Sequence, residues 1–212
     1  YIYNIDNLKN HNENTVFEEK IGKKAQNLLE LAANGFNVPH FSVITNRYFK
    51  EVILKEIEMY NQEAGNNDEI KDWDAVFSGN VERKIENIIR IIKNHKIKEE
   101  FEKEIENALN EESYYAVRSS SIEEDSSNFS FAGQFETYLY VKKENMLEKI
   151  KEVWISSFSN HVMKYRKEGK INNEINVPAV IIQEMVNSEK AGVGFSVNPV
   201  NNNYDEVVIS GT

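Results

Sequence analysis

Apolar side chains recur at helical spacing in three segments of the first 112 residues. The three predicted helical segments run from Lys24 to the stop signal at Asn34-Gly35, from about Asn46 to Tyr60, and over residues 81 to 110. Between the first two, Phe36 to Thr45 is predicted to form a short buried strand. Residues 1 to 22 are polar and rich in asparagine, and residues 61 to 80 are weakly patterned.

From residue 113 onward the pattern changes to short apolar runs of strand length. Five runs are predicted to be strands: Tyr114 to Val117, Thr137 to Val141, Ala179 to Val186, Gly192 to Val197, and Glu206 to Ile209. A serine-rich loop is expected at residues 118 to 134, and one helix from about Asn145 to Lys167. The pattern therefore predicts an α+β fold with a helix-rich lobe at residues 1–112 and a β-rich lobe at residues 113–212.

The composition is that of a globular protein and excludes several functional classes. The chain has 212 residues and no cysteine, so a disulfide scaffold and a thiolate metal site are excluded, and a cytoplasmic location is expected. The four histidines are scattered without ligand spacing, and no metal ligands are predicted in this chain. The net charge of −10 repels polyanions, so no nucleic-acid partner is expected. No apolar run approaches the roughly 20 residues that span a bilayer, so no membrane partner is expected either.

The most informative candidate for chemistry is Arg118, which follows the predicted strand from Tyr114 to Val117 and precedes three serines. A guanidinium offers five N–H donors in a rigid fork that suits phosphate oxygens. The alternative is a structural arginine that pairs with Glu123 or Asp125 and closes a turn. The residues by themselves leave both interpretations open.

Three further candidate segments each have a structural alternative. Lys24 lies near a helix start, where the helix dipole favours an anion, although an exposed surface lysine is the simpler interpretation. Gly133 would let the backbone approach a phosphate and Thr137 would donate a hydroxyl, or the two would belong to a hairpin turn. Gln183 and Met185 end an apolar strand and would face a purine ring, or Met185 would lie in the core.

Four segments carry recognisable motifs in a fixed order. They are Ile21 to Leu28; Gly35 to Pro39; Ala116 to Asp125 with Ser130 to Thr137; and Ile182 to Val186 with Gly192 to Pro199. The most specific are A-V-R-S-S at residues 116–120 and S-F-A-G-Q at residues 130–134. Together the segments resemble the N-terminal ATP-binding domain of the pyruvate phosphate dikinase and phosphoenolpyruvate synthase family, a domain that rifampicin phosphotransferases share.

The resemblance implies an ATP-grasp-like fold, in which two lobes clamp ATP. The matching positions give six binding residues: Lys24 and Arg118 at the phosphates, Gly133 and Thr137 in the phosphate loop, and Gln183 and Met185 at the adenine hinge. Lys24 and Arg118 would also be the catalytic residues, because phosphoryl transfer depends on positioning and charge neutralisation.

The chain departs from the family pattern at three places. Lys23 replaces a glycine, His40-Phe41 replaces Pro-Gly, and the chain stops at Thr212, before the family's G-L-G-E segment and the acidic residue, glutamine and arginine that complete the Mg-ATP site. The Mg²⁺ ligands, the phosphohistidine carrier domain and the pyruvate-binding domain are therefore expected outside this chain.

The function that the resemblance implies is that of part of an enzyme. In the parent protein, ATP would transfer its β-phosphoryl group to a carrier histidine, with release of AMP and phosphate, and the histidine would phosphorylate pyruvate. This chain alone would be inactive. Two alternatives remain open: the same domain serving another acceptor, as in a rifampicin phosphotransferase, and a non-catalytic nucleotide-binding module.

Overall fold

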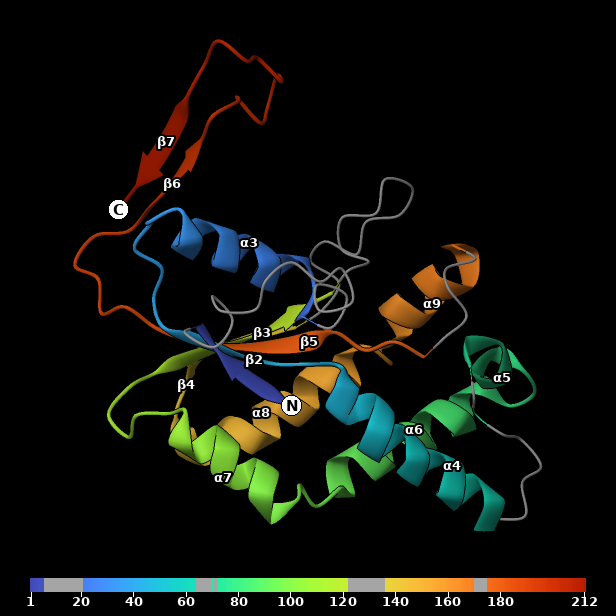
Figure 1. Cartoon of the computed structure of the whole chain (residues 1–212). Helices are drawn as coiled ribbons and strands as arrows, with labels where there is room; N and C mark the ends of the chain where they lie inside the picture. Colours follow the sequence, from blue (N-terminus) through green and yellow to red (C-terminus); the bar gives the residue numbers. More distant parts are fainter. Residues whose placement is uncertain (6–20, 64–69, 71, 122–135, 170–174) are drawn as a thin grey trace.

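The centre of the fold is a five-stranded sheet with the strand order β1-β2-β5-β3-β4, in which every neighbouring pair is antiparallel. The computed structural model describes residues 1–5, 21–63, 70, 72–121, 136–169 and 175–212 of the chain. In sheet order the strands are Ile2–Asn4, Phe41–Ile44, Ala179–Glu184, Tyr115–Ser120 and Thr137–Val141. β5, the last of the five along the chain, thus lies in the middle of the sheet (Figure 1).

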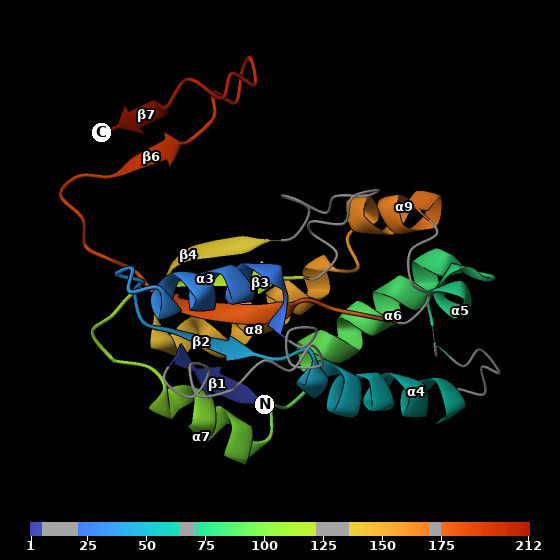
Figure 2. The ribbon, with the colours of Figure 1, turned by 45° about the horizontal axis from the view of Figure 1, so that its top comes forward.

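Helices cover both faces of this sheet, so the fold is α+β. α3 (Lys23–Ala33) lies over one face, and α6 (Val81–Asn94), α7 (Glu99–Asn107) and α8 (Met146–Ser156) lie under the other (Figures 1 and 2). Within the described ranges the other helical segments are η1 (Phe49–Ile53), α4 (Leu54–Glu63), α5 (Trp73–Phe77), η3 (Lys143–Asn145) and α9 (Asn160–Gly169).

The larger hydrophobic core lies between the sheet and α6 and α8. It joins apolar side chains of the sheet to those of the helices, among them Val117, Val180, Ile182, Ile88, Ile92 and Trp154. The Tyr48 ring stacks between two aromatic neighbours, with centroid distances of 5.7 Å to Trp154 and 4.2 Å to Phe101. Ile88, Ile91 and Ile92 of α6 are buried, and Ile85 and Ile89 are partly buried against the same core, as expected for a helix with one apolar face.

A smaller core lies between the other face of the sheet and α3. Its buried members include Phe41, Val43, Ala179 and Ile181 from the strands and Ala25 from the helix, and Leu28 and Leu29 pack against them. All four side chains of β2 and the first four of β5 are buried. The two central strands therefore contribute side chains to both cores, which explains their continuous apolar runs.

The helical segment predicted over residues 81 to 110 is split into α6 and α7 at His95. The His95 ring is buried and contacts the Tyr48 hydroxyl at 3.1 Å and the Glu56 carboxylate at 2.5 Å. The Lys151 ammonium donates to the backbone carbonyls of Lys93, at 3.1 Å, and of His95, at 2.5 Å, at the end of α6. All of these partners are distant in sequence, and the two bonds from Lys151 satisfy carbonyls at the helix end in place of a continued helix.

The single helix predicted from Asn145 to Lys167 is likewise wrong, because α8 ends at Ser156 and α9 begins at Asn160. Ser159 is at the N-cap position of α9, and its hydroxyl accepts a hydrogen bond from the backbone N–H of Val162 at 3.4 Å. Two short elements, β1 and α5, also lie in segments where the sequence predicts no regular structure.

Strands from both sides of residue 112 share one sheet. β2 pairs with β5 along Phe41 to Ile44, and β5 pairs with β3 along Tyr115 to Ser120. The larger core also joins side chains from both sides of this position. The division into two lobes at residue 112 stays a prediction.

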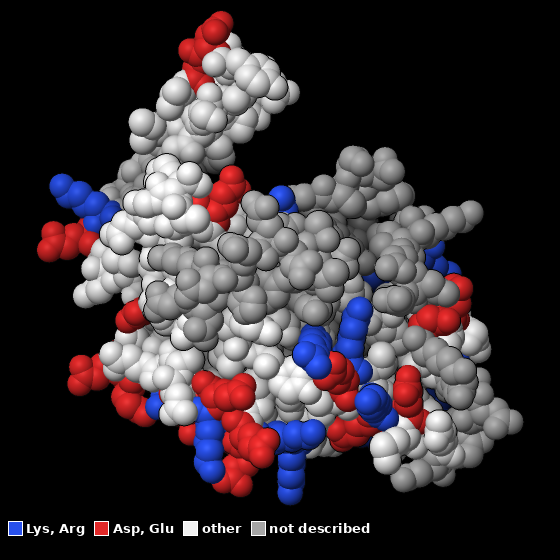
Figure 3. All heavy atoms as spheres, in the orientation of Figure 1, with Lys and Arg blue, Asp and Glu red and all other residues white. Residues whose placement is uncertain are grey.

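A second, two-stranded sheet projects from the rest of the described structure (Figures 1 and 2). It pairs β6 (Gly192–Phe195) with β7 (Val208–Gly211). Its surface is mostly uncharged outside its tip (Figure 3), and its exposed apolar side chains include Val193, Phe195, Val207 and Ile209. A lone two-stranded ribbon is only marginally stable in water, so the ribbon adds little to the stability of the domain.

The first prediction concerns the end of α6. We expect Lys151→Ala to lower the free energy of unfolding by about 1 to 3 kcal/mol, because two carbonyls lose a charged donor. Lys103→Ala is the matched control, since Lys103 makes an exposed ion pair with Glu99 within α7, and it should lower the same quantity by about 0.5 kcal/mol or less. Urea denaturation followed by circular dichroism measures both. Equal losses would contradict the capping role.

Candidate functional site

Three of the predicted site residues lie on the same face of the sheet. Arg118 on β3 pairs with Thr137 on β4 and with Ile181 on β5. Directly paired residues of an antiparallel ladder point to the same face, and so do alternate residues of one strand. Gln183 is two residues from Ile181, so Arg118, Thr137 and Gln183 all belong to the face that α3 covers.

Arg118 and Gln183 are in direct contact. Nη1 of Arg118 donates a hydrogen bond to Oε1 of Gln183 at 3.3 Å, and both side chains are half-buried. This bond uses one of the five donors of the guanidinium and limits the directions in which the others point. Glu123 and Asp125, the alternative partners, lie outside the described residues, as does Gly133.

Lys24 is the second residue of α3, and the start of this helix is held against the end of β3. The backbone N–H of Lys23 donates to the carbonyl of Ser121 at 3.2 Å, and that of Ala25 donates to the hydroxyl of Ser120 at 3.1 Å. Lys24 lies between these two bonded residues, and its side chain is half-buried rather than fully exposed. Arg118 lies two residues before Ser120, so the helix start and the guanidinium are anchored to the same stretch of strand.

Gly22 makes this close approach possible. Its φ of +75° is in the left-handed region, and a Cβ added to it would lie 2.2 Å from the backbone oxygen of Ser120. Only glycine avoids both the backbone strain and the clash. Gly22 and Ser120 are site-forming residues that the sequence prediction missed as individuals, although both lie inside the motifs that carry the family resemblance.

Met185 lies just beyond the end of β5. Its N–H donates to the carbonyl of Tyr114 at 2.8 Å, which continues the ladder with the chain before β3. Its sulfur accepts from the N–H of Tyr140 at 3.1 Å. Met185 is half-buried, and among the described residues neither core cluster includes it. The side chain is therefore at the rim of the sheet, two residues from Gln183.

The neighbour of Thr137 on β4 is a phenol that stays neutral. Burial, with smaller contributions from Glu152 and Glu136, raises the pKa of Tyr138 to about 12. The ammonium of Lys149 lies 4.9 Å from the centre of its ring. Tyr138 belongs to the opposite face of the sheet, where it packs against the larger core.

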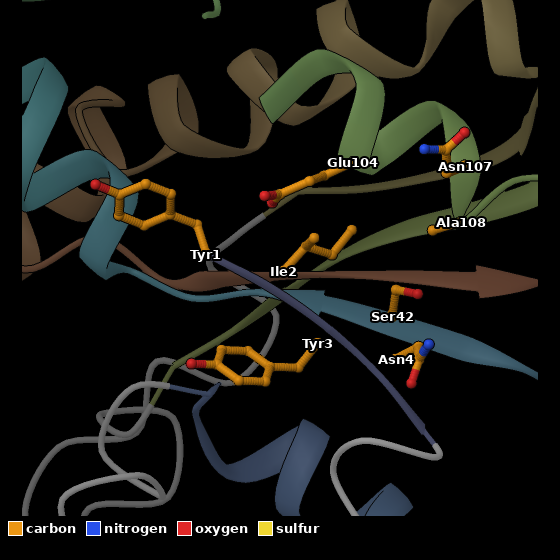
Figure 4. Close-up of a pocket in the computed structure, with 8 residues that line it drawn as sticks. All are labelled: Tyr1, Ile2, Tyr3, Asn4, Ser42, Glu104, Asn107 and Ala108. Atoms are coloured by element: carbon orange, nitrogen blue, oxygen red, sulfur yellow. The ribbon is translucent and has the colours of Figure 1, made fainter. Parts of the chain in front are cut away.

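A cavity of about 480 Å³ lies away from these residues, between β1, β2 and α7 (Figure 4). Its lining includes Asn4, Ser42, Asn107 and the carboxylate of Glu104, and it contains none of the predicted site residues. Among the described residues, no group of three or more histidine, aspartate or glutamate side chains is placed to hold a metal ion, and no helix is long and apolar enough to cross a bilayer.

The described structure is thus an α+β domain in which the helix start that contains Lys24 is hydrogen-bonded to the end of the strand that contains Arg118. Residues 18–212 match the family model described as the AMP/ATP-binding domain of pyruvate phosphate dikinase. Because this match covers most of the chain, the chain belongs to that family.

The similar proteins include one that is named a phosphotransferase and others that are named phosphoenolpyruvate synthase. The uncharacterized phosphotransferase YvkC of Bacillus subtilis is 35% identical over 89% of this chain and 21% of that protein. The phosphoenolpyruvate synthase of Pyrococcus furiosus is 33% identical over 90% of this chain and 28% of that protein. The phosphoenolpyruvate synthase of Aeropyrum pernix is 44% identical over 47% of this chain and 12% of that protein. The chain thus spans less than a third of the length of these relatives.

The second prediction concerns the contact between Gly22 and Ser120. We expect Gly22→Ala to lower the free energy of unfolding by about 3 kcal/mol or more, because it adds a backbone clash to the strain of a positive φ. Gly35→Ala is the matched control, because Gly35 has a φ of +82° and open space around its Cβ position. It should lower the same quantity by about 1 kcal/mol, the strain alone. Chemical denaturation compares the two variants, and similar losses would mean that the close approach contributes nothing.

Proposed function

We propose that this chain is the ATP-binding part of a dikinase that resembles phosphoenolpyruvate synthase. The observation that carries the proposal is the placement of Lys24 and Arg118, one at the start of α3 and the other on the strand that holds this helix start. The family match and the names of the relatives support the nucleotide. The ATP-grasp-like two-lobe fold remains part of the proposal.

The start of α3 has the properties of an anion site. Its first turn contains Lys23 and Lys24 and no acidic residue. Two positive charges are unfavourable at this end of a helix dipole, so a bound anion there would stabilise the turn. A phosphate group there would neutralise both lysines and accept hydrogen bonds from backbone N–H groups. Arg118 on the adjoining strand supplies a planar fork for further phosphate oxygens. These groups fit the triphosphate of ATP.

The remaining candidates would complete the nucleotide site. Thr137 pairs with Arg118 across β3 and β4, so its hydroxyl would reach the same phosphates, together with Gly133. Gln183 lies on β5 and Met185 just beyond its end, and we place the adenine ring against these two residues. The Mg²⁺ that accompanies ATP would neutralise phosphate charge, with its ligands supplied by a segment outside this chain.

The reaction of the parent protein would be the transfer of the β-phosphoryl group of ATP to a carrier histidine and from there to pyruvate. The carrier domain and the pyruvate-binding domain would lie outside this chain, so the chain alone should not form phosphoenolpyruvate. An acceptor other than pyruvate, as in a rifampicin phosphotransferase, is the second candidate, because one of the similar proteins is named only as a phosphotransferase.

The third prediction tests the phosphate role of Arg118. We expect Arg118→Ala to weaken ATP binding by about tenfold or more, the equivalent of one charge-assisted contact. Arg118→Lys should restore only part of the affinity, because a point charge does not replace a bidentate fork. Arg83→Ala is the control, since Arg83 is exposed on α6, under the other face of the sheet. Titration calorimetry measures all four proteins, and equal affinities would reject the site.

The fourth prediction separates the phosphates from the adenine. Lys24→Ala should weaken the binding of ATP by about tenfold and leave adenosine within about twofold, because Lys24 would touch only phosphate. Met185→Ala should weaken ATP and adenosine by similar factors, because it would touch only the base. Calorimetric titrations with both ligands give the two ratios. If Lys24→Ala weakened both ligands equally, Lys24 would have been placed at the wrong end of the nucleotide.

A further inference from the structure

The start of α3 lacks the cap that its own sequence would normally supply. The N-cap residue is Gly22, which has no side chain to accept a hydrogen bond from the first turn. The N–H of Ala25, the third helical residue, is one that an N-cap serine or aspartate usually satisfies. Here its acceptor is the hydroxyl of Ser120, 95 residues away in sequence, at 3.1 Å. Ser120 therefore caps α3 from another element.

This capping bond is shielded from water. Ser120 is 1% exposed, and Ala25 is fully buried. A buried N–H group that loses its only strong acceptor loses stability, because water is not there to replace the bond. The bond therefore constrains the first turn more than an exposed helix cap would.

Two further contacts fix the same turn. The N–H of Lys23 donates to the carbonyl of Ser121, and Gly22 packs directly on the backbone of Ser120. Lys24 lies between the two residues whose N–H groups are held. Its Cα thus has little freedom to shift relative to β3.

Ser120 and Arg118 are alternate residues of β3 and share one face of the strand. The strand that presents the guanidinium therefore also sets the position of the lysine. We propose that Ser120 is a positioning residue: its hydroxyl holds the first turn of α3 so that Lys24 and Arg118 reach the phosphates of one nucleotide together. This inference rests on the proposed function, because it assigns Ser120 a role at the same phosphate site.

A positioning role predicts a selective loss of affinity. Without the hydroxyl, the turn that carries Lys24 gains freedom, and binding a triphosphate has to remove that freedom again. The base contacts at the end of β5 do not involve this turn. Ser120→Ala should therefore weaken ATP binding and leave adenosine binding unchanged, whereas a general loss of structure would weaken both.

The experiment is a double-mutant cycle by titration calorimetry with ATP and with adenosine, on the chain and on the Ser120→Ala, Lys24→Ala and double variants. We expect Ser120→Ala to weaken ATP binding by about fivefold, within the range of a lost helix cap, and adenosine binding by less than about twofold. In the Lys24→Ala background, Ser120→Ala should have no further effect on ATP, because it acts through Lys24. Ser156→Ala is the control, since Ser156 is also buried and bonded to a carbonyl, but within α8. It should leave both affinities unchanged.

The outcomes separate this inference from the proposed function. If Lys24→Ala leaves ATP binding unchanged, the proposed function and the role of Ser120 both fail. If Lys24→Ala weakens ATP binding and Ser120→Ala does not, or if the two losses simply add, only the positioning role is overturned. Should Ser120→Ala fail to fold, Ser120→Cys keeps the volume with a weaker acceptor, and its ATP affinity should fall about twofold or more with adenosine unchanged. Unchanged ATP binding by a folded Ser120→Cys protein would also overturn the role.

Discussion

The central sheet has to be covered on both faces, and the rest of the structure follows from this requirement. β2 and β5 have apolar side chains on both sides, unlike the strands of many antiparallel sheets, which leave one face in water. The larger core with α6 and α8 covers one side. α3 covers the other, but it has only 11 residues and reaches only part of that face. Arg118 and Gln183 belong to this same face, and both are half-buried.

The candidate site is basic within an acidic protein. The net charge of −10 would repel a nucleotide at long range, yet salt screens charges farther away than about 10 Å. Contacts within hydrogen-bond distance are much less affected. In the proposed function, the two lysines at the helix start and the guanidinium on the adjoining strand would therefore attract phosphate locally despite the net charge of the chain.

Elements with a strong local pattern could be predicted from the sequence, and elements defined by distant contacts could not. The stop of α3 at Asn34-Gly35 and the strand from Thr137 to Val141 agree with the structure, because stop signals and short runs of strand-forming residues act locally. The end of α6 depends on Lys151, 57 residues beyond it and from another helix. The three residues of β1 are too few to show a period.

The same distinction applies to the candidate site. The motifs around Lys24 and Arg118 predict the residue types. No local signal indicates that Ser120 caps α3, which is distant in sequence. The contact between Arg118 and Gln183 likewise depends on the pairing of β3 with β5. The roles of Gly133 and of the other binding residues stay predictions.

The position of β5 has a consequence for the synthesis of the protein. β1, β2, β3 and β4 all leave the ribosome before β5, but β2 and β3 have no partner on their inner edges until β5 arrives. The nascent chain therefore exposes two open strand edges and the apolar faces of several helices while residues up to 184 are still being translated. Such intermediates are prone to aggregate. A pause in translation before β5 has emerged would prolong this exposure, whereas a pause after it would not.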